Sequence, residues 1–171
     1  MARKFGQKRE ICIDPLAYNI GLIGESGIGK STLINQVCEK LARDDGYNAL
    51  DIGNEDGHDA INGIVSAKIP DWATFKEFCD DVIENKLTDY KDLRVIVLDT
   101  FDQLLEITEP EVIRMHNRAN PDKPKITSIK AAFGGFMAGE DKAIQIVLDK
   151  LWELKSVGVS FIAIGHTKKK D

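Results

Sequence analysis

The chain lacks the features that would place it in a membrane, in a secretory pathway or on DNA through bulk charge. No apolar run approaches the ~18 residues that a membrane-spanning helix needs. The basic start MARKFGQKRE is not followed by the apolar segment of a signal peptide. The net charge of −5 excludes a protein that holds nucleic acid by overall positive charge, so any such contact requires a local basic patch. We therefore expect a cytoplasmic protein that does not associate with membranes.

Cysteine is also scarce, with three residues, Cys12, Cys38 and Cys79, far apart in 171. Their spacing matches no zinc motif, and a cytoplasmic protein is not expected to hold disulfides. Cys38 and Cys79 fall on apolar helix faces, so we expect reduced thiols that fill the core.

Short apolar runs alternate with helical periodicity along most of the chain, which predicts one α/β domain with a mostly parallel sheet and helices on both of its faces. We predict a basic tail and lead-in at 1–17 and one domain at 18–171. The expected strands are 18–24, 48–53, 64–70, 95–99 and 159–165. Three helices are expected. One spans 31–43, a second begins after the capping residue Asp71, and a third spans 143–157 and ends before Gly158.

Residues 107–142 interrupt this rhythm. The segment holds three prolines and three glycines and shows no sustained apolar period. We expect a long irregular loop there, and such loops within compact domains are usually functional or disordered.

Residues 24–31 match the phosphate-binding pattern G-x-x-x-x-G-K-S/T. The glycines allow backbone N–H groups to turn toward an anion, and the following helix directs its positive end at the same place. Lys30 then reaches the outer phosphates, and the Ser31 hydroxyl binds Mg²⁺. The predicted nucleotide-binding residues are Gly24, Glu25, Ser26, Gly27, Ile28, Gly29, Lys30, Ser31 and Thr32.

The apolar run VIVL ends in Asp99, which suits the acid that holds Mg²⁺ beside a P-loop. The next residue is Thr100, so the water-activating glutamate found there in many P-loop ATPases is missing. Glu55, just past the strand at 48–53, is the candidate base, and His58 in the same loop is a weaker one. The alternative is that both belong to a solvated acidic loop.

His166 ends the last predicted strand, where its imidazole would reach the γ-phosphate if that strand lies between those leading to Lys30 and Asp99. The alternative is an exposed histidine at a strand end.

With these residues in place, the chain resembles the RecA-like ATPases, and most closely a phage-encoded branch related to single-strand annealing recombinases of the Sak type. The resemblance covers roughly residues 18–171. It rests on GESGIGKS, on IGNED with Glu55, on VIVLDT with Asp99, and on IGH, where His166 stands in place of the bacterial glutamine. It implies an ATP- and Mg²⁺-dependent ATPase, a homo-oligomer, and a role in DNA recombination or annealing in the host cytoplasm.

In the same family the segment after the Asp-Ser/Thr strand contains a DNA-binding loop. Here the corresponding segment is rich in cations and ends in FGGF, which suits phosphate contact and base stacking on single-stranded DNA. The candidate residues are Arg114, Arg118, Lys123, Lys125, Lys130, Phe133 and Phe136. The alternative for the loop is a solvated segment whose phenylalanines pack on the core.

Two functions therefore remain open. One is an Mg-ATPase that acts on DNA, with Lys30, Glu55 and His166 as its catalytic residues. The other is a nucleotide-gated module that turns over negligibly and recruits a partner protein. A GTPase is disfavoured, because Asp99 is not followed by the glycine of the D-x-x-G switch.

Overall fold

The computed structural model describes residues 14–53 and 65–167 of the chain. A five-stranded sheet in the order β1-β5-β4-β2-β3 forms its centre, and every neighbouring pair is parallel. The strands are β1 (Ile20–Gly24), β2 (Tyr47–Ile52), β3 (Ser66–Ile69), β4 (Val95–Asp99) and β5 (Ser160–His166). The sequence predicted each of them to within two residues.

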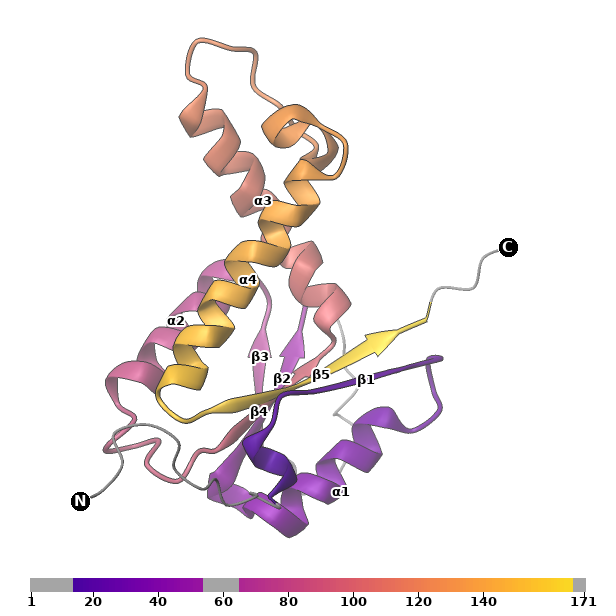
Figure 1. Cartoon of the computed structure of the whole chain (residues 1–171), viewed down its shortest axis with the longest axis vertical. Helices are drawn as coiled ribbons and strands as arrows, with labels where there is room; N and C mark the ends of the chain where they lie inside the picture. Colours follow the sequence, from indigo (N-terminus) through magenta and orange to yellow (C-terminus); the bar gives the residue numbers. More distant parts are fainter. Residues whose placement is uncertain (1–13, 54–64, 168–171) are drawn as a thin grey trace, which may run out of the picture.

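Helices cover both faces of this sheet, as expected from the sequence. Figure 1 shows α1 on one side and α2 and α4 on the other. The α-helices are α1 (Lys30–Ala42), α2 (Trp72–Glu84), α3 (Phe101–Ala119) and α4 (Ala138–Ser156). Short 3₁₀ helices occur at η1 (Pro15–Ala17), η2 (Asp44–Gly46) and η3 (Ile129–Gly134). None of the helices in the described ranges is long and apolar enough to cross a membrane.

The central strand β4 is buried on both faces, because successive side chains point to opposite sides. Val95 and Val97 pack in the cluster with α1, and Ile96 and Leu98 pack in the cluster with α2 and α4. This continuous apolar run is typical of a parallel strand covered on both sides.

The two cysteines that the structure describes are free and fully buried, as expected. Cys38 belongs to α1 and Cys79 to α2, and each packs in the cluster between its helix and the sheet. Burial away from water raises the pKa of the Cys38 thiol to about 11 and that of Cys79 to about 12. Both thiols therefore stay protonated at neutral pH and act as small apolar core residues.

The expectation of an irregular loop over 107–142 is wrong at both of its ends. Helix α3 continues through Pro110 to Ala119, and α4 begins at Ala138. Pro110 breaks one backbone hydrogen bond, but Leu104, Thr108 and Val112 form a buried stripe along the same helix. Burial of that stripe offsets the free energy lost with the hydrogen bond at Pro110. Local sequence does not indicate this burial, because it depends on tertiary packing.

Residues 111–143 form a helical protrusion that extends beyond the sheet (Figure 1). It has its own small core of Val112, Ile129, Ala132 and Ala143. Asn117 fastens the connection between α3 and η3, because its side chain donates to the carbonyl of Ile126 (3.0 Å) and accepts from the N–H of that residue (2.9 Å).

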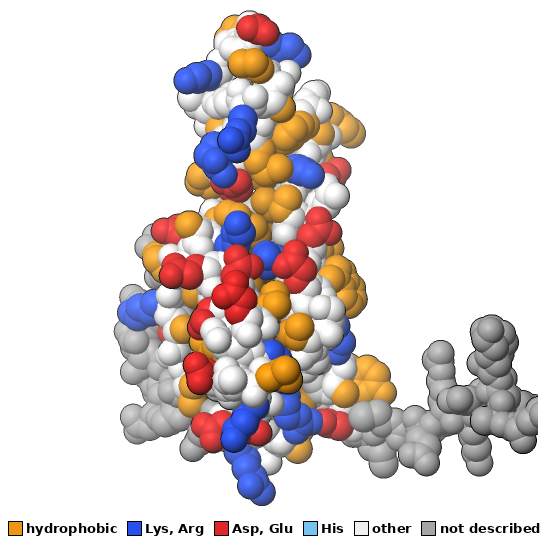
Figure 2. Space-filling view, turned by 90° about the vertical axis from the view of Figure 1, so that its left-hand side faces the viewer, with side chains coloured by type: hydrophobic (Ala, Val, Ile, Leu, Met, Phe, Trp, Pro, Cys, Tyr) orange, Lys and Arg blue, Asp and Glu red, His pale blue; other side chains and the backbone are white. Residues whose placement is uncertain are grey.

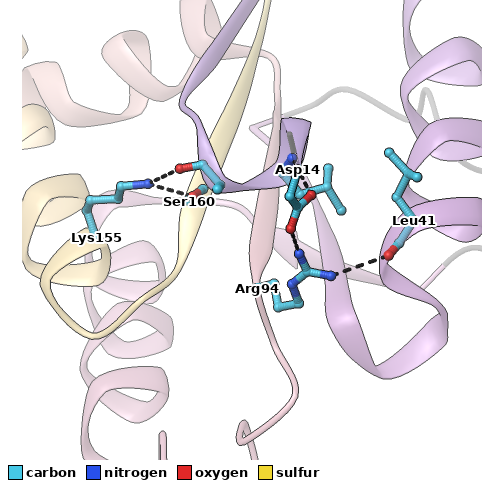
Figure 3. Close-up of polar contacts among 7 residues, drawn as sticks. Asp14, Leu41, Arg94, Lys155 and Ser160 are labelled. Carbon is cyan, nitrogen blue, oxygen red and sulfur yellow. Dashed lines mark hydrogen bonds and ion pairs between the residues drawn. The ribbon is translucent and has the colours of Figure 1, made fainter. Parts of the chain in front are cut away.

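The lead-in segment is fastened to the edge of the sheet opposite the carboxyl ends of the strands. Asp14 forms an ion pair with Arg94, whose guanidinium also donates to the Leu41 carbonyl at 3.4 Å (Figure 3). Lys155 donates to the carbonyl of Ala17 at 2.7 Å. These contacts extend the packed domain to at least Asp14, and residues 1–13 lie outside the described ranges.

The close contact between α4 and η3 predicts an unusual response to substitution of Gly139. A Cβ atom at this position would lie 2.2 Å from the carbonyl oxygen of Ile129. Glycine-to-alanine changes within helices ordinarily stabilise by up to about 1 kcal/mol. We expect Gly139→Ala instead to lower the free energy of unfolding by about 1–3 kcal/mol, because the two backbones must separate. Urea denaturation measures this change, and a stabilised variant would contradict the close packing.

Candidate functional site

The loop between β1 and α1 turns back sharply over the start of the helix. Gly27 has φ 80° and Gly29 has φ 89°, a left-handed conformation that glycine adopts without strain. Gly29 is also the N-cap of α1 and has no side chain with which to cap it. The first N–H groups of α1 are therefore directed at the loop, which is the geometry of an anion site.

The ammonium group of Lys30 is held within this loop. It donates to the carbonyl oxygens of Gly24 (3.0 Å) and Glu25 (2.7 Å), and the residue is only 7% exposed. A positive charge fixed at this point, next to a helix N-terminus, favours a polyphosphate over a neutral ligand.

Ser31 and Asp99 come together from α1 and β4. The Ser31 hydroxyl donates to Oδ2 of Asp99 at 2.5 Å, and Asp99 is 5% exposed. A hydroxyl and a carboxylate at one point are the hard oxygen donors that Mg²⁺ prefers. The residues predicted for the metal therefore fit that ion in chemistry and in placement.

His166 lies on β5, and β5 lies between β1 and β4 as the predicted site requires. It is in register with Gly24, the first residue of the phosphate-binding pattern. Ile162 and Ile164 pack in the cluster with α1. Since side chains alternate along a strand, the His166 imidazole shares that face with Lys30 and Asp99.

Glu55 and His58, the candidate bases, lie outside the described residues. Thr100 is 1% exposed, and its hydroxyl accepts the N–H of Gln103 at the start of α3. It therefore caps a helix, and the residue after Asp99 supplies no carboxylate to activate water.

One acidic residue near the site was not predicted. Asp51 on β2 is in register with Asp99 on β4 and is 4% exposed. It occupies the carboxyl end of an apolar strand, the same kind of position that identified Asp99. The sequence signal for Asp51 is the apolar run in NALDI, which has this acid near its end.

This arrangement of a parallel sheet, a glycine loop, a lysine and a serine–aspartate contact defines a P-loop NTPase. The sequence matches the AAA domain family (AAA_24) over residues 16–171, and the chain belongs to that family. Membership confirms the predicted P-loop NTPase class and supports nucleotide binding. No curated protein matches the chain.

Removal of the Lys30 ammonium tests this site directly. Lys30→Ala should weaken the binding of Mg-ATP at least tenfold, because a buried cation beside a helix N-terminus contributes more to the binding of an anion than a surface charge does. Lys40→Ala is the matched control, since Lys40 is an exposed lysine in the last turn of the same helix. Isothermal titration calorimetry measures both. Equal affinities for Lys30→Ala and the parent chain would show that the phosphate site is misassigned.

Proposed function

We propose that the protein is an Mg²⁺-dependent ATPase of the RecA-like kind that acts on single-stranded DNA in phage-type recombination or annealing. The Ser31–Asp99 contact at 2.5 Å carries the ATPase part of this proposal. It joins the phosphate-binding helix to the central strand at the point where a nucleotide-bound Mg²⁺ would be needed.

The chemistry follows from positioning and charge. A bound Mg²⁺ would neutralise charge on the β- and γ-phosphates. The N–H groups of the loop and the Lys30 ammonium hold the same phosphates in line for attack. Glu55 is proposed to polarise the attacking water, and His166 to donate a hydrogen bond to the γ-phosphate. The strand order supports the role of His166, whereas the role of Glu55 rests on sequence alone.

The helical protrusion supports the DNA part of the proposal. Figure 2 shows Lys and Arg side chains on this narrow upper end, while Asp and Glu gather across the middle of the same face. The predicted DNA-binding cations are exposed: Arg114, Arg118, Lys123, Lys125 and Lys130. A phosphate backbone would be attracted to the protrusion and repelled by the acidic body.

The two phenylalanine side chains of the protrusion are exposed to solvent and do not fill a core. Phe136 is 100% exposed and Phe133 is 40% exposed. Residues 133–137, here called the η3–α4 turn, all have positive φ. The N–H of Phe133 donates to Nδ1 of His116 at 3.0 Å, and the two rings meet edge to face. Exposed rings suit base stacking, and they do not support the alternative in which both phenylalanines fill the core.

Arg114 differs from the other cations of the protrusion. Its guanidinium donates to both carboxylate oxygens of Glu111, at 2.6 and 2.8 Å. Glu111 therefore neutralises the positive charge that Arg114 adds to the protrusion. We therefore assign the main phosphate attraction to Arg118, Lys123, Lys125 and Lys130.

We also propose that the protein works as a homo-oligomer in the host cytoplasm, which the RecA-like resemblance supports. A second function, the nucleotide-gated module that recruits a partner protein, is favoured by one observation, the buried Thr100 in the position of the usual glutamate. ATP hydrolysis with and without single-stranded DNA separates the two. Tight binding of ATP with background turnover under both conditions would favour the module.

The proposed general base can be tested without loss of nucleotide affinity. Glu55→Gln keeps the size of the side chain and removes its basicity, so hydrolysis should fall ~10²-fold while ATP binding stays normal. Asp56→Asn, at the next position of the sequence, is the matched control. A parental rate for Glu55→Gln together with a slow Asp56→Asn would move the base to Asp56.

The DNA proposal predicts two separable effects on affinity. Replacement of the four main cations of the protrusion by alanine should weaken binding and reduce the salt slope by about 3, because each phosphate contact on a single strand releases ~0.7 counterion. Phe136→Ala should weaken binding with the slope unchanged, since stacking releases few ions. Fluorescence anisotropy with an oligothymidylate at several salt concentrations measures both.

A control with the same change in net charge uses four exposed cations of the body: Lys40, Arg43, Lys76 and Lys91. It should leave the slope near the parental value. Equal effects of the two four-residue variants would show that overall charge, and not the protrusion, governs binding.

A further inference from the structure

The last residue of β5 directs its backbone N–H at a side chain instead of a strand. The N–H of His166 donates to Oδ2 of Asp102 at 2.8 Å. Strand β4 ends at Asp99, which is in register with Ile164, so His166 lies two residues past the end of that neighbour. The N–H of the next residue, Thr167, donates to the Gly24 carbonyl on β1 at 3.2 Å.

Successive N–H groups of a strand point to opposite sides. Since the N–H of Thr167 goes to β1, the N–H of His166 points toward the side of β4. The Asp102 carboxylate therefore stands where a longer β4 would have offered a carbonyl. A hydrogen bond to an ionised carboxylate is shorter and stronger than the neutral bond that it replaces.

Asp102 is itself held firmly. It is the second residue of α3, in a first turn that begins at the Thr100 cap, and a carboxylate is favourable at that end of a helix. The same carboxylate lies against Gly165, where a Cβ would be 3.6 Å from Oδ2. One short helical turn thus joins Asp99, the predicted metal ligand, to the backbone of His166.

Asp102 lies on the side of the sheet opposite the P-loop, so it is not placed to bind the nucleotide or its metal ion directly. Helix α3 packs with Leu104 in the cluster on the face opposite α1. The P-loop lies on the α1 face, and strand alternation assigns the His166 side chain to the same face. The end of β5 therefore separates the Asp102 carboxylate from the loop that would hold the phosphates.

We propose that Asp102 is a positioning residue of the phosphate site. It fixes the backbone of His166 on the side that β4 leaves open, and so keeps the imidazole directed at the γ-phosphate. This inference rests on the proposed role of His166. Without Asp102, the end of β5 is paired with β1 alone, and the imidazole loses its direction while Lys30 and Ser31 keep theirs.

The test is the ratio of the affinities for Mg-ATP and Mg-ADP, measured by calorimetry. Asp102→Ala should lower this ratio about tenfold, since small displacements of a positioned group cost one to two orders of magnitude. The affinity for ADP should stay at the parental value, because ADP has no γ-phosphate. Asp102→Asn keeps the size and one acceptor oxygen, so it should lose less.

Asp71→Ala is the matched control. Asp71 also accepts a backbone N–H, that of Thr74 at 2.8 Å, but at the start of α2 beside β3 at the other edge of the sheet. Its loss should lower the melting temperature to a similar degree and leave the ATP/ADP ratio unchanged. An equal fall in the ratio for both variants would reduce Asp102 to a general stabilising contact and overturn the inference.

A double variant shows whether Asp102 acts through His166. Asp102→Ala combined with His166→Ala should have the same ratio as His166→Ala alone, because the effects of coupled residues do not add. Additive losses would overturn the inference. If the parent chain binds neither nucleotide, the proposed function and the inference are both contradicted. If the parent chain prefers Mg-ATP to Mg-ADP and Asp102→Ala has the same affinity ratio, the inference alone is contradicted.

Discussion

Burial of β4 on both faces is the constraint on which the rest of the structure depends. Val95–Leu98 are fully buried, so the chain must supply helices to both sides of the sheet. It does so with α1 on one face and α2, α3 and α4 on the other. Asp99 is the first polar residue of this strand, and it emerges where α1 presents Ser31. The metal-binding pair is therefore a consequence of how the core closes.

The parts of the fold that were predictable from the sequence are those with a local signal. Apolar runs marked the strands, and the spacing of glycine, lysine and serine marked the phosphate loop. Asp71 was expected to cap α2, and its carboxylate accepts the N–H of Thr74. Each of these patterns lies within about a dozen residues, which is the range over which periodicity and capping operate.

What the sequence did not reveal depends on contacts between distant segments. Pro110 indicated an interruption, but the buried stripe of α3 keeps the helix intact. The pairing of Asp51 with Asp99 needs the strand register, and the bond from His166 to Asp102 needs the length of β4. In each case tertiary geometry assigns a partner that neighbouring residues do not indicate.

The backbone of the η3–α4 turn has a thermodynamic consequence of its own. Three of its residues, Phe133, Phe136 and Met137, are not glycine and yet adopt positive φ. Such conformations cost of order 1–3 kcal/mol each, and the surrounding structure must supply that energy. Local unfolding should therefore require less free energy at this turn than in the sheet, so its amide hydrogens should exchange with solvent earliest within the protrusion. The most exposed aromatic ring of the described chain, that of Phe136, thus lies in a segment whose local unfolding should cost comparatively little free energy.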